Sequence, residues 1–177
     1  MMVYSSLFAS LIVAGSYITF PFPSSPVPVS LQSLFVLLAG LLLGRKWGTA
    51  SVAIYLLAGA VGLPVFAKGM GGIGHFVAPT GGYLVGFIPA AFVIGFFAEK
   101  KKSGATSDVI AMIAGSLIIY IAGIFWLKIH TGLSLSKTIV AGMVPFLPGD
   151  AMKIAAAVFV ANILRPVINL KETRLKK

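Results

Sequence analysis

Asp150 and Lys153 are the residues of this chain whose types and spacing point most directly to chemistry. They follow the helix-breaking stretch Pro145-Phe-Leu-Pro-Gly149 inside a long apolar run. A spacing of three residues places both side chains on one face of the helix that restarts there. Charged side chains at membrane depth are costly and are usually functional, so the pair predicts a binding site. A purely structural ion pair that locks the helices together stays open.

A second polar group lies in the stretch Pro79–Phe87. Thr80 can cap the helix that follows, Gly82 lets a ligand approach the backbone, and Tyr83 offers a ring face with a polar tip. Gln32 lies in the first turn of another apolar segment. A helix start with small packing residues is the alternative for Pro79–Phe87.

Several functions are disfavoured because the motifs that they require are absent or lack the structure that should surround them. The run Gly69–Gly74 matches the spacing of a dinucleotide-binding loop, but no strand precedes it. There is no Walker A sequence, so the chain is not expected to hydrolyse ATP by a P-loop mechanism. His75 and His130 are far apart and have no acids at ligand spacing, so no metal site is expected.

Composition assigns the chain to the membrane. Its 177 residues are 58% hydrophobic and only 10% charged, and the mean hydropathy is +1.01. Backbone groups inside lipid must bond within their own segment, so the apolar runs predict an all-α, multi-pass membrane protein in which residues 1–177 form a single domain. The net charge of +10 is concentrated in short loops and the C-terminal tail, where it sets topology. No nucleic-acid partner is therefore expected.

Six membrane-spanning helices are predicted, at Val3–Phe20, Leu31–Gly44, Trp47–Val61, Tyr83–Ala98, Asp108–Lys128 and within Leu135–Asn169. Basic residues are concentrated on the side shared by the two termini, at Arg45, Lys46, Lys100, Lys101, Lys102, Arg165, Lys171, Arg174, Lys176 and Lys177. The opposite loops hold only Lys68, Lys128 and Lys137. The positive-inside rule therefore places both termini in the cytoplasm. The proline-rich segment Pro21–Pro28, the glycine-rich segment Lys68–Gly82 and the break before Asp150 then fall on the outside.

The first predicted span carries small residues at every fourth position, Ser6, Ser10 and Ala14. Small residues at this spacing let another helix approach closely. Internal packing and a docking face for a partner protein are both compatible with the pattern.

Taken in order along the chain, four motifs resemble the BioY family, the biotin-binding S components of energy-coupling factor (ECF) vitamin importers. They are Val27–Gly44, Gly62–Phe66, Pro79–Phe87 and Pro148–Lys153. The resemblance covers essentially the whole length. It implies a six-helix membrane fold with an outward-opening pocket. The small residues of the first span resemble the family's A-x-x-x-A docking surface, with serine at positions 6 and 10.

The function implied by the resemblance is high-affinity biotin binding and uptake across the cytoplasmic membrane. The implied partners are a membrane coupling subunit and two cytoplasmic ATPases. No cofactor is implied, and the chain by itself is not expected to be an enzyme. A solitary secondary transporter of biotin or another vitamin stays open, as does a membrane-embedded enzyme with Asp150 as the base.

The resemblance also implies roles for the polar residues. Asp150 would accept a hydrogen bond from a ureido N–H of biotin, and Lys153 would donate to the ureido oxygen or to the valerate carboxylate. Tyr83 would cover the apolar thiophane ring, while Thr80 or Gln32 could meet the carboxylate. The segments Pro21–Pro28 and Gly69–Gly82 are expected to close over the ligand.

Overall fold

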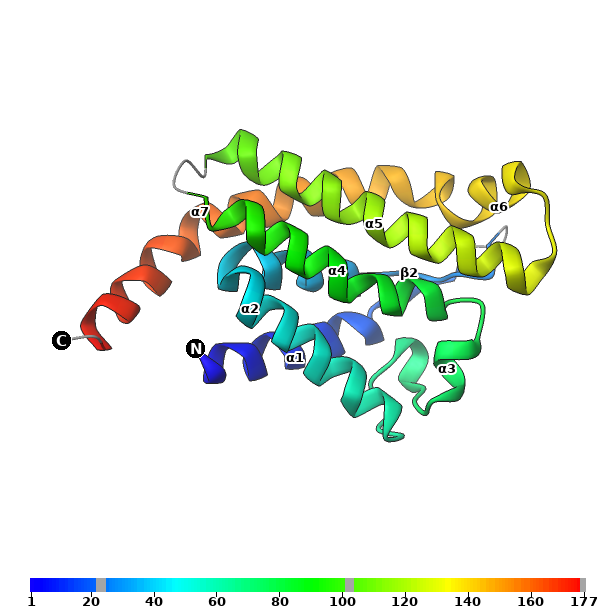
Figure 1. Cartoon of the computed structure of the whole chain (residues 1–177), viewed down its shortest axis with the longest axis horizontal. Coiled ribbons are helices and arrows are strands. Elements are labelled where there is room, and N and C mark those ends of the chain that lie inside the picture. The colour runs from blue at the N-terminus through cyan, green and yellow to red at the C-terminus, as the bar shows by residue number, and fades with distance from the viewer. Residues whose placement is uncertain (22–24, 101–103, 176–177) are drawn as a thin grey trace.

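The computed structural model describes the backbone of residues 1–21, 25–100 and 104–175, and the side chains of these residues as far as Arg165. The elements run in the order α1 (Met2–Tyr17), β1 (Thr19–Phe20), β2 (Val29–Ser30), α2 (Gln32–Ala60), η1 (Ala67–Gly69), α3 (Gly74–Val77), α4 (Gly81–Ala98), α5 (Ala105–Thr131), α6 (Leu135–Gly142), η2 (Val144–Phe146) and α7 (Leu147–Leu175). Long helices pack side by side with their axes roughly aligned (Figure 1). The predicted all-α membrane architecture is confirmed.

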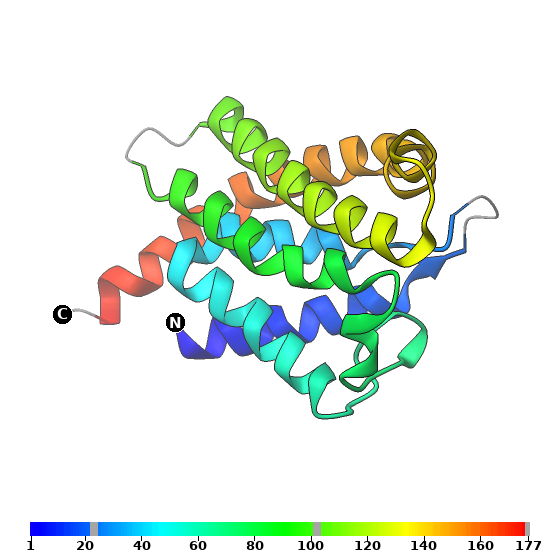
Figure 2. The same ribbon diagram turned by 45° about the vertical axis from the view of Figure 1, so that its right-hand side comes forward.

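Helix α2 consists of two arms joined at Gly44, whose backbone has φ 75° and ψ −179°. A Cβ placed on Gly48 would lie 2.6 Å from the carbonyl oxygen of Ala39, so the second arm folds back against the first. The turn is visible where α2 changes direction in Figure 2. The segments predicted at Leu31–Gly44 and Trp47–Val61 are these two arms.

Replacing Gly44 with alanine is expected to lower the free energy of unfolding by about 1–3 kcal/mol, because only glycine adopts this backbone conformation without strain. A Cβ here would also lie 2.6 Å from Oε1 of Glu99, which accepts a hydrogen bond from the backbone N–H of Arg45. Thermal unfolding in detergent, followed by circular dichroism, measures the loss. Gly104→Ala is the control, since Gly104 has an ordinary φ and open space around it. Equal stability of the two variants would contradict the prediction.

Four helical stretches in the described part of the chain are long and apolar enough to cross a membrane, namely Gln32–Ala60, Gly81–Ala98, Ala105–Thr131 and Leu135–Arg165. The shorter apolar helix Met2–Tyr17 packs beside them. Counting the arms of α2 separately, these stretches correspond to the six predicted segments. The start of α1 and the end of α7 lie at the same end of the bundle (Figure 1).

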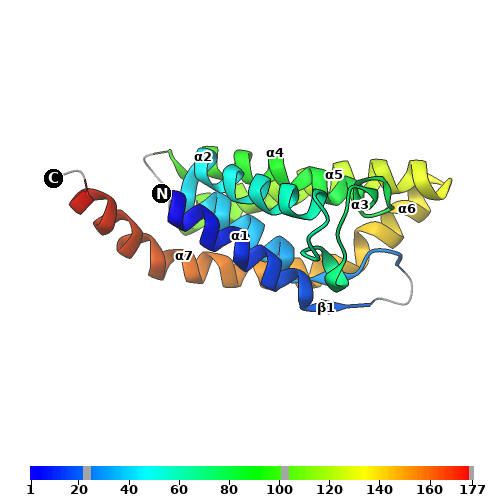
Figure 3. The same ribbon diagram turned by 90° about the horizontal axis from the view of Figure 1, so that it is seen from below.

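The first helix is shorter than predicted: it ends at Tyr17 rather than at Phe20. Thr19 and Phe20 instead pair with Ser30 and Val29 as a two-residue antiparallel hairpin. The extended conformation follows from Pro21, which disfavours helix in the residue before it. Residues 22–24 of the predicted proline-rich lid lie outside the described residues. Figure 3 shows the hairpin at the end of the bundle away from the termini, hereafter the loop end.

The glycine-rich segment also lies at the loop end and contains η1 and α3 rather than only loop. The residues that lead from α2 into this segment are tied to α1 by two hydrogen bonds, from the Tyr17 hydroxyl to the Pro64 carbonyl and from Ser16 Oγ to the Val65 carbonyl (2.7 Å). Phe66 is fully buried, and Gly59 makes room for its ring. This segment is therefore a packed cap on the bundle.

Helices α4 and α5 pack closely because glycines on each helix face large side chains on the other. Gly115 receives the side chain of Ile94, and Gly123 receives the ring of Tyr83. Close helix approach through small residues is the common packing mode within membranes. The interface fixes α4 and α5 as a rigid wall beside the polar residues.

Helix α7 is attached to α5 near the end away from the loop end. Both terminal nitrogens of Arg165 donate to the carboxylate of Asp108, each at 3.1 Å. Asp108 is buried, at 1% exposure. Paired geometry of this kind is the strongest arrangement for a guanidinium and a carboxylate.

Candidate binding site

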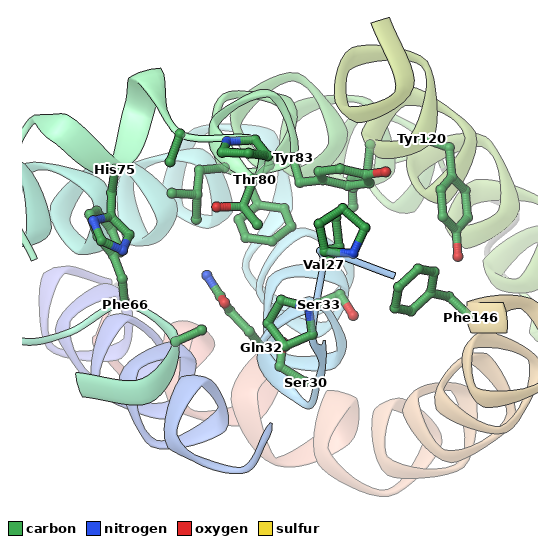
Figure 4. Close-up of a pocket in the computed structure, with 18 of the residues that line it drawn as sticks. Val27, Ser30, Gln32, Ser33, Phe66, His75, Thr80, Tyr83, Tyr120 and Phe146 are labelled. Carbon is green, nitrogen blue, oxygen red and sulfur yellow. The ribbon is translucent and has the colours of Figure 1, made fainter. Parts of the chain in front are cut away.

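A cavity of about 380 Å³ opens at the loop end, enclosed by α2, α4, α5, α7 and the segments on either side of α2. Much of its wall is apolar, formed by side chains such as Leu37, Phe66, Leu84, Phe87 and Ile119. A few polar groups interrupt this wall (Figure 4). An apolar cavity of this volume with a few convergent polar groups is typical of a small-molecule site.

Asp150 and Lys153 both line the cavity and form an ion pair, with 3.0 Å between Lys153 Nζ and Asp150 Oδ1. Their side chains are only 18% and 9% exposed. The helix break is placed slightly differently from the prediction: α7 already begins at Leu147, so Pro148 and Gly149 lie in its first turn. Proline is tolerated there because the first backbone N–H groups of a helix have no partner within it.

Two residues that the sequence reasoning missed complete the hydrogen bonding of this pair. The Tyr120 hydroxyl donates to Oδ2 of Asp150, and Lys153 Nζ donates to Ser33 Oγ at 3.0 Å. Both residues line the cavity. Tyr120 could have been predicted as a site residue because its hydroxyl is a polar group inside the fifth apolar span. Ser33 directly follows Gln32, but nothing in the local pattern distinguished it.

Gln32, Thr80 and Tyr83 also line the cavity. Gln32 donates from Nε2 to the Tyr55 hydroxyl at 2.6 Å, which fixes its amide. Thr80 occupies the position before α4, but its side chain makes no capping hydrogen bond, contrary to the expectation. Its hydroxyl is therefore available to a ligand. Tyr83 presents its ring to the cavity, while its hydroxyl donates to the Gly142 carbonyl at 2.8 Å.

Gly82 does not line the cavity, which corrects the expectation that a ligand approaches the backbone there. A Cβ at this position would lie 2.3 Å from the Cβ of Trp126 and 2.5 Å from the carbonyl oxygen of Ala122. Glycine is needed here because α4 and α5 touch. The sequence showed that space was required but not which neighbour required it.

The cavity has a second polar end, also missed from the sequence. Lys68 and His75 line it, and the His75 ring stacks on Phe66 with 5.7 Å between ring centroids. In Figure 4, Phe66 and His75 lie on the opposite side of the view from Tyr120 and Phe146. The cavity therefore carries a neutral ion pair near Tyr120 and an additional cation, Lys68.

The three small residues that recur at every fourth position of α1 are exposed on the surface of the bundle. The hydroxyls of Ser6 and Ser10 donate to carbonyl oxygens of their own helix, at 3.3 and 3.0 Å. Ser6, Ser10 and Ala14 therefore form a smooth outer face with its polar atoms satisfied. Internal packing within this chain does not explain them.

Comparison with known proteins identifies the family. A sequence profile described as the BioY family matches residues 1–169. This chain belongs to the BioY family. The biotin transporter BioY of Thermotoga maritima is 46% identical over 164 residues, which cover 93% of this chain and 95% of that protein. The probable biotin transporter BioY of Pyrococcus horikoshii is 39% identical over 160 residues, which cover 90% and 93% of the two chains.

The fold of this chain also matches a solved structure. That structure is the crystal structure at 2.1 Å of the S-component for biotin from an ECF-type ABC transporter. The two structures superpose with a TM-score of 0.87 and 31% sequence identity, covering 93% of this chain and 89% of the other. The arrangement of helices around the cavity is thus that of a membrane transport component.

Proposed function

We propose that this chain binds biotin and acts as the substrate-binding S component of an ECF transporter in the cell membrane. The observation that carries the proposal is the largely buried Asp150–Lys153 pair inside a cavity of ligand size. BioY relatives named as biotin transporters, and a solved S-component for biotin with the same fold, support it.

The cavity is chemically complementary to biotin. The ureido ring has two N–H donors and one carbonyl acceptor, which match the carboxylate of Asp150 and the ammonium of Lys153. Phe87 and the ring of Tyr83 supply apolar surface for the thiophane ring. With the ureido ring at the ion pair, the valerate carboxylate extends toward Lys68 and the Thr80 hydroxyl. Binding in this mode requires no covalent step and no cofactor.

Isothermal titration calorimetry of the purified full-length chain with biotin tests the proposal. We expect saturable binding to one site, with no comparable binding of thiamine or riboflavin. Equal binding of the three vitamins, or no binding of biotin, would contradict it. Reconstitution with and without the coupling subunit and ATPases separates an S component from a solitary secondary transporter. Only the former requires ATP hydrolysis for uptake.

The outer face of α1 is the proposed contact with the membrane coupling subunit. Ser10→Trp is expected to reduce ATP-dependent biotin uptake by the assembled transporter at least tenfold, because a large side chain prevents close helix approach. Biotin binding by the isolated chain should be unchanged, since Ser10 lies on the surface away from the lining residues. Ile121→Trp, at an exposed position on α5, is the control. Equal uptake by both variants would remove this face from the interface.

A further inference from the structure

The helix that carries both charged residues of the site is the least enclosed of the long helices. In the apolar 18-residue window of the stretch Leu135–Arg165, which includes α7 as far as Arg165, 17% of residues are buried, compared with 61% in the corresponding window of α2. Met152 and Phe159 of α7 are exposed. Apolar packing therefore constrains the rotation of α7 only weakly around the cavity, and polar contacts with neighbouring helices must contribute.

Two such contacts lie in the cavity itself. Tyr120 reaches Asp150 from α5, and Ser33 reaches Lys153 from α2. Each charged side chain thus has one partner on its own helix and one on a neighbouring helix. The four residues form a continuous chain of hydrogen bonds across three helices.

We infer that Tyr120 and Ser33 are positioning residues, which hold the Asp150–Lys153 pair in the orientation that receives the ligand. That the ligand is biotin rests on the proposed function. After accepting from Tyr120 and Lys153, the carboxylate of Asp150 still has free lone pairs. Lys153 has used two of its three N–H donors, and the Ser33 hydroxyl can still donate. The network therefore keeps an acceptor and donors in place for a cyclic urea.

Pre-orientation has a measurable consequence for affinity. A carboxylate or ammonium that rotates freely must lose that freedom when the ligand binds, which weakens the observed affinity. Tyr120→Phe retains the ring and removes only the hydroxyl that holds Asp150. Ser33→Ala likewise removes only the oxygen that holds Lys153.

Calorimetry of the full-length chain with biotin measures the effect. We expect Tyr120→Phe and Ser33→Ala each to raise Kd about tenfold, as for loss of a hydrogen bond to a charged group. Ser33→Thr keeps the hydroxyl and should restore most of the affinity. Tyr4→Phe is the matched control, since Tyr4 lies on α1, outside the cavity lining. Wild-type affinity in both Tyr120→Phe and Ser33→Ala would overturn the inference.

A double-mutant cycle distinguishes positioning from a general structural role. If Tyr120 acts through Asp150, Tyr120→Phe should change Kd less than about twofold in an Asp150→Ala background, which removes the acceptor of the Tyr120 hydroxyl. The same tenfold change in both backgrounds would show that Tyr120 acts independently of Asp150 and would overturn the inference.

The same cycle on ligand-free protein, read as thermal stability in detergent, separates this inference from the proposed function. Non-additive losses of thermal stability for Tyr120→Phe and Asp150→Ala support a direct hydrogen bond from Tyr120 to the Asp150 carboxylate. Additive losses of thermal stability would overturn the inference that Tyr120 positions Asp150, whether or not the wild-type chain binds biotin. Failure of the wild type to bind biotin would instead contradict only the proposed function.

Discussion

Asp150→Asn and Lys153→Ala are each expected to weaken biotin binding by about 1.5–3 kcal/mol, the value of a hydrogen bond to a charged group. Lys153→Ala should have the larger effect, because it leaves the Asp150 carboxylate, which is only 18% exposed, without its cation. Asp150→Asn keeps a polar group of the same shape. Calorimetry with biotin measures both changes.

The control for this prediction is a charge removed far from the cavity. Arg45→Ala disrupts an ion pair with Glu99 in which both side chains are more than 40% exposed, at 42% and 44%. Arg45→Ala should bind biotin as the wild type does. The double variant Asp150→Asn/Lys153→Ala should lose less affinity than the sum of the single losses, because the two groups interact directly. Wild-type affinity in both single variants would remove the pair from the binding site.

Arg165→Ala is expected to have the largest effect on stability, a loss of about 3 kcal/mol. The reason is that Asp108, at 1% exposure, would keep a buried carboxylate without its bidentate cation. Thermal or denaturant unfolding in detergent measures the change. Combining Arg165→Ala with Asp108→Asn should recover part of the loss, because the uncompensated charge is then absent.

The exposed Arg45–Glu99 ion pair is again the control, here for the effect on stability. Arg45→Ala should cost less than about 1 kcal/mol, as is usual for a solvent-screened ion pair. A loss in Arg165→Ala no greater than in Arg45→Ala would show that Asp108 does not depend on Arg165. Both variants keep the backbone N–H of Arg45 that contacts Glu99, so the Gly44 turn is preserved.

The sequence by itself determined the membrane helices and the existence of a polar site. Long apolar runs in which backbone groups must bond internally leave only helices as an outcome. The cost of charge at membrane depth marked Asp150 and Lys153, and helix geometry placed them on one face. The match to the BioY family profile and to a solved S-component agrees with the predicted membrane transport fold.

Only the tertiary structure decided which residues surround that pair. Ser33 and Lys153 are 120 positions apart, and Tyr120 and Asp150 are 30 positions apart. Helical periodicity assigns a residue to a face of its own helix, but not to a neighbour on another helix. For the same reason Gly82 was assigned to the ligand, although it accommodates Trp126. The charged pair was therefore predictable from local cost and spacing, whereas its partners depended on how α2, α5 and α7 pack.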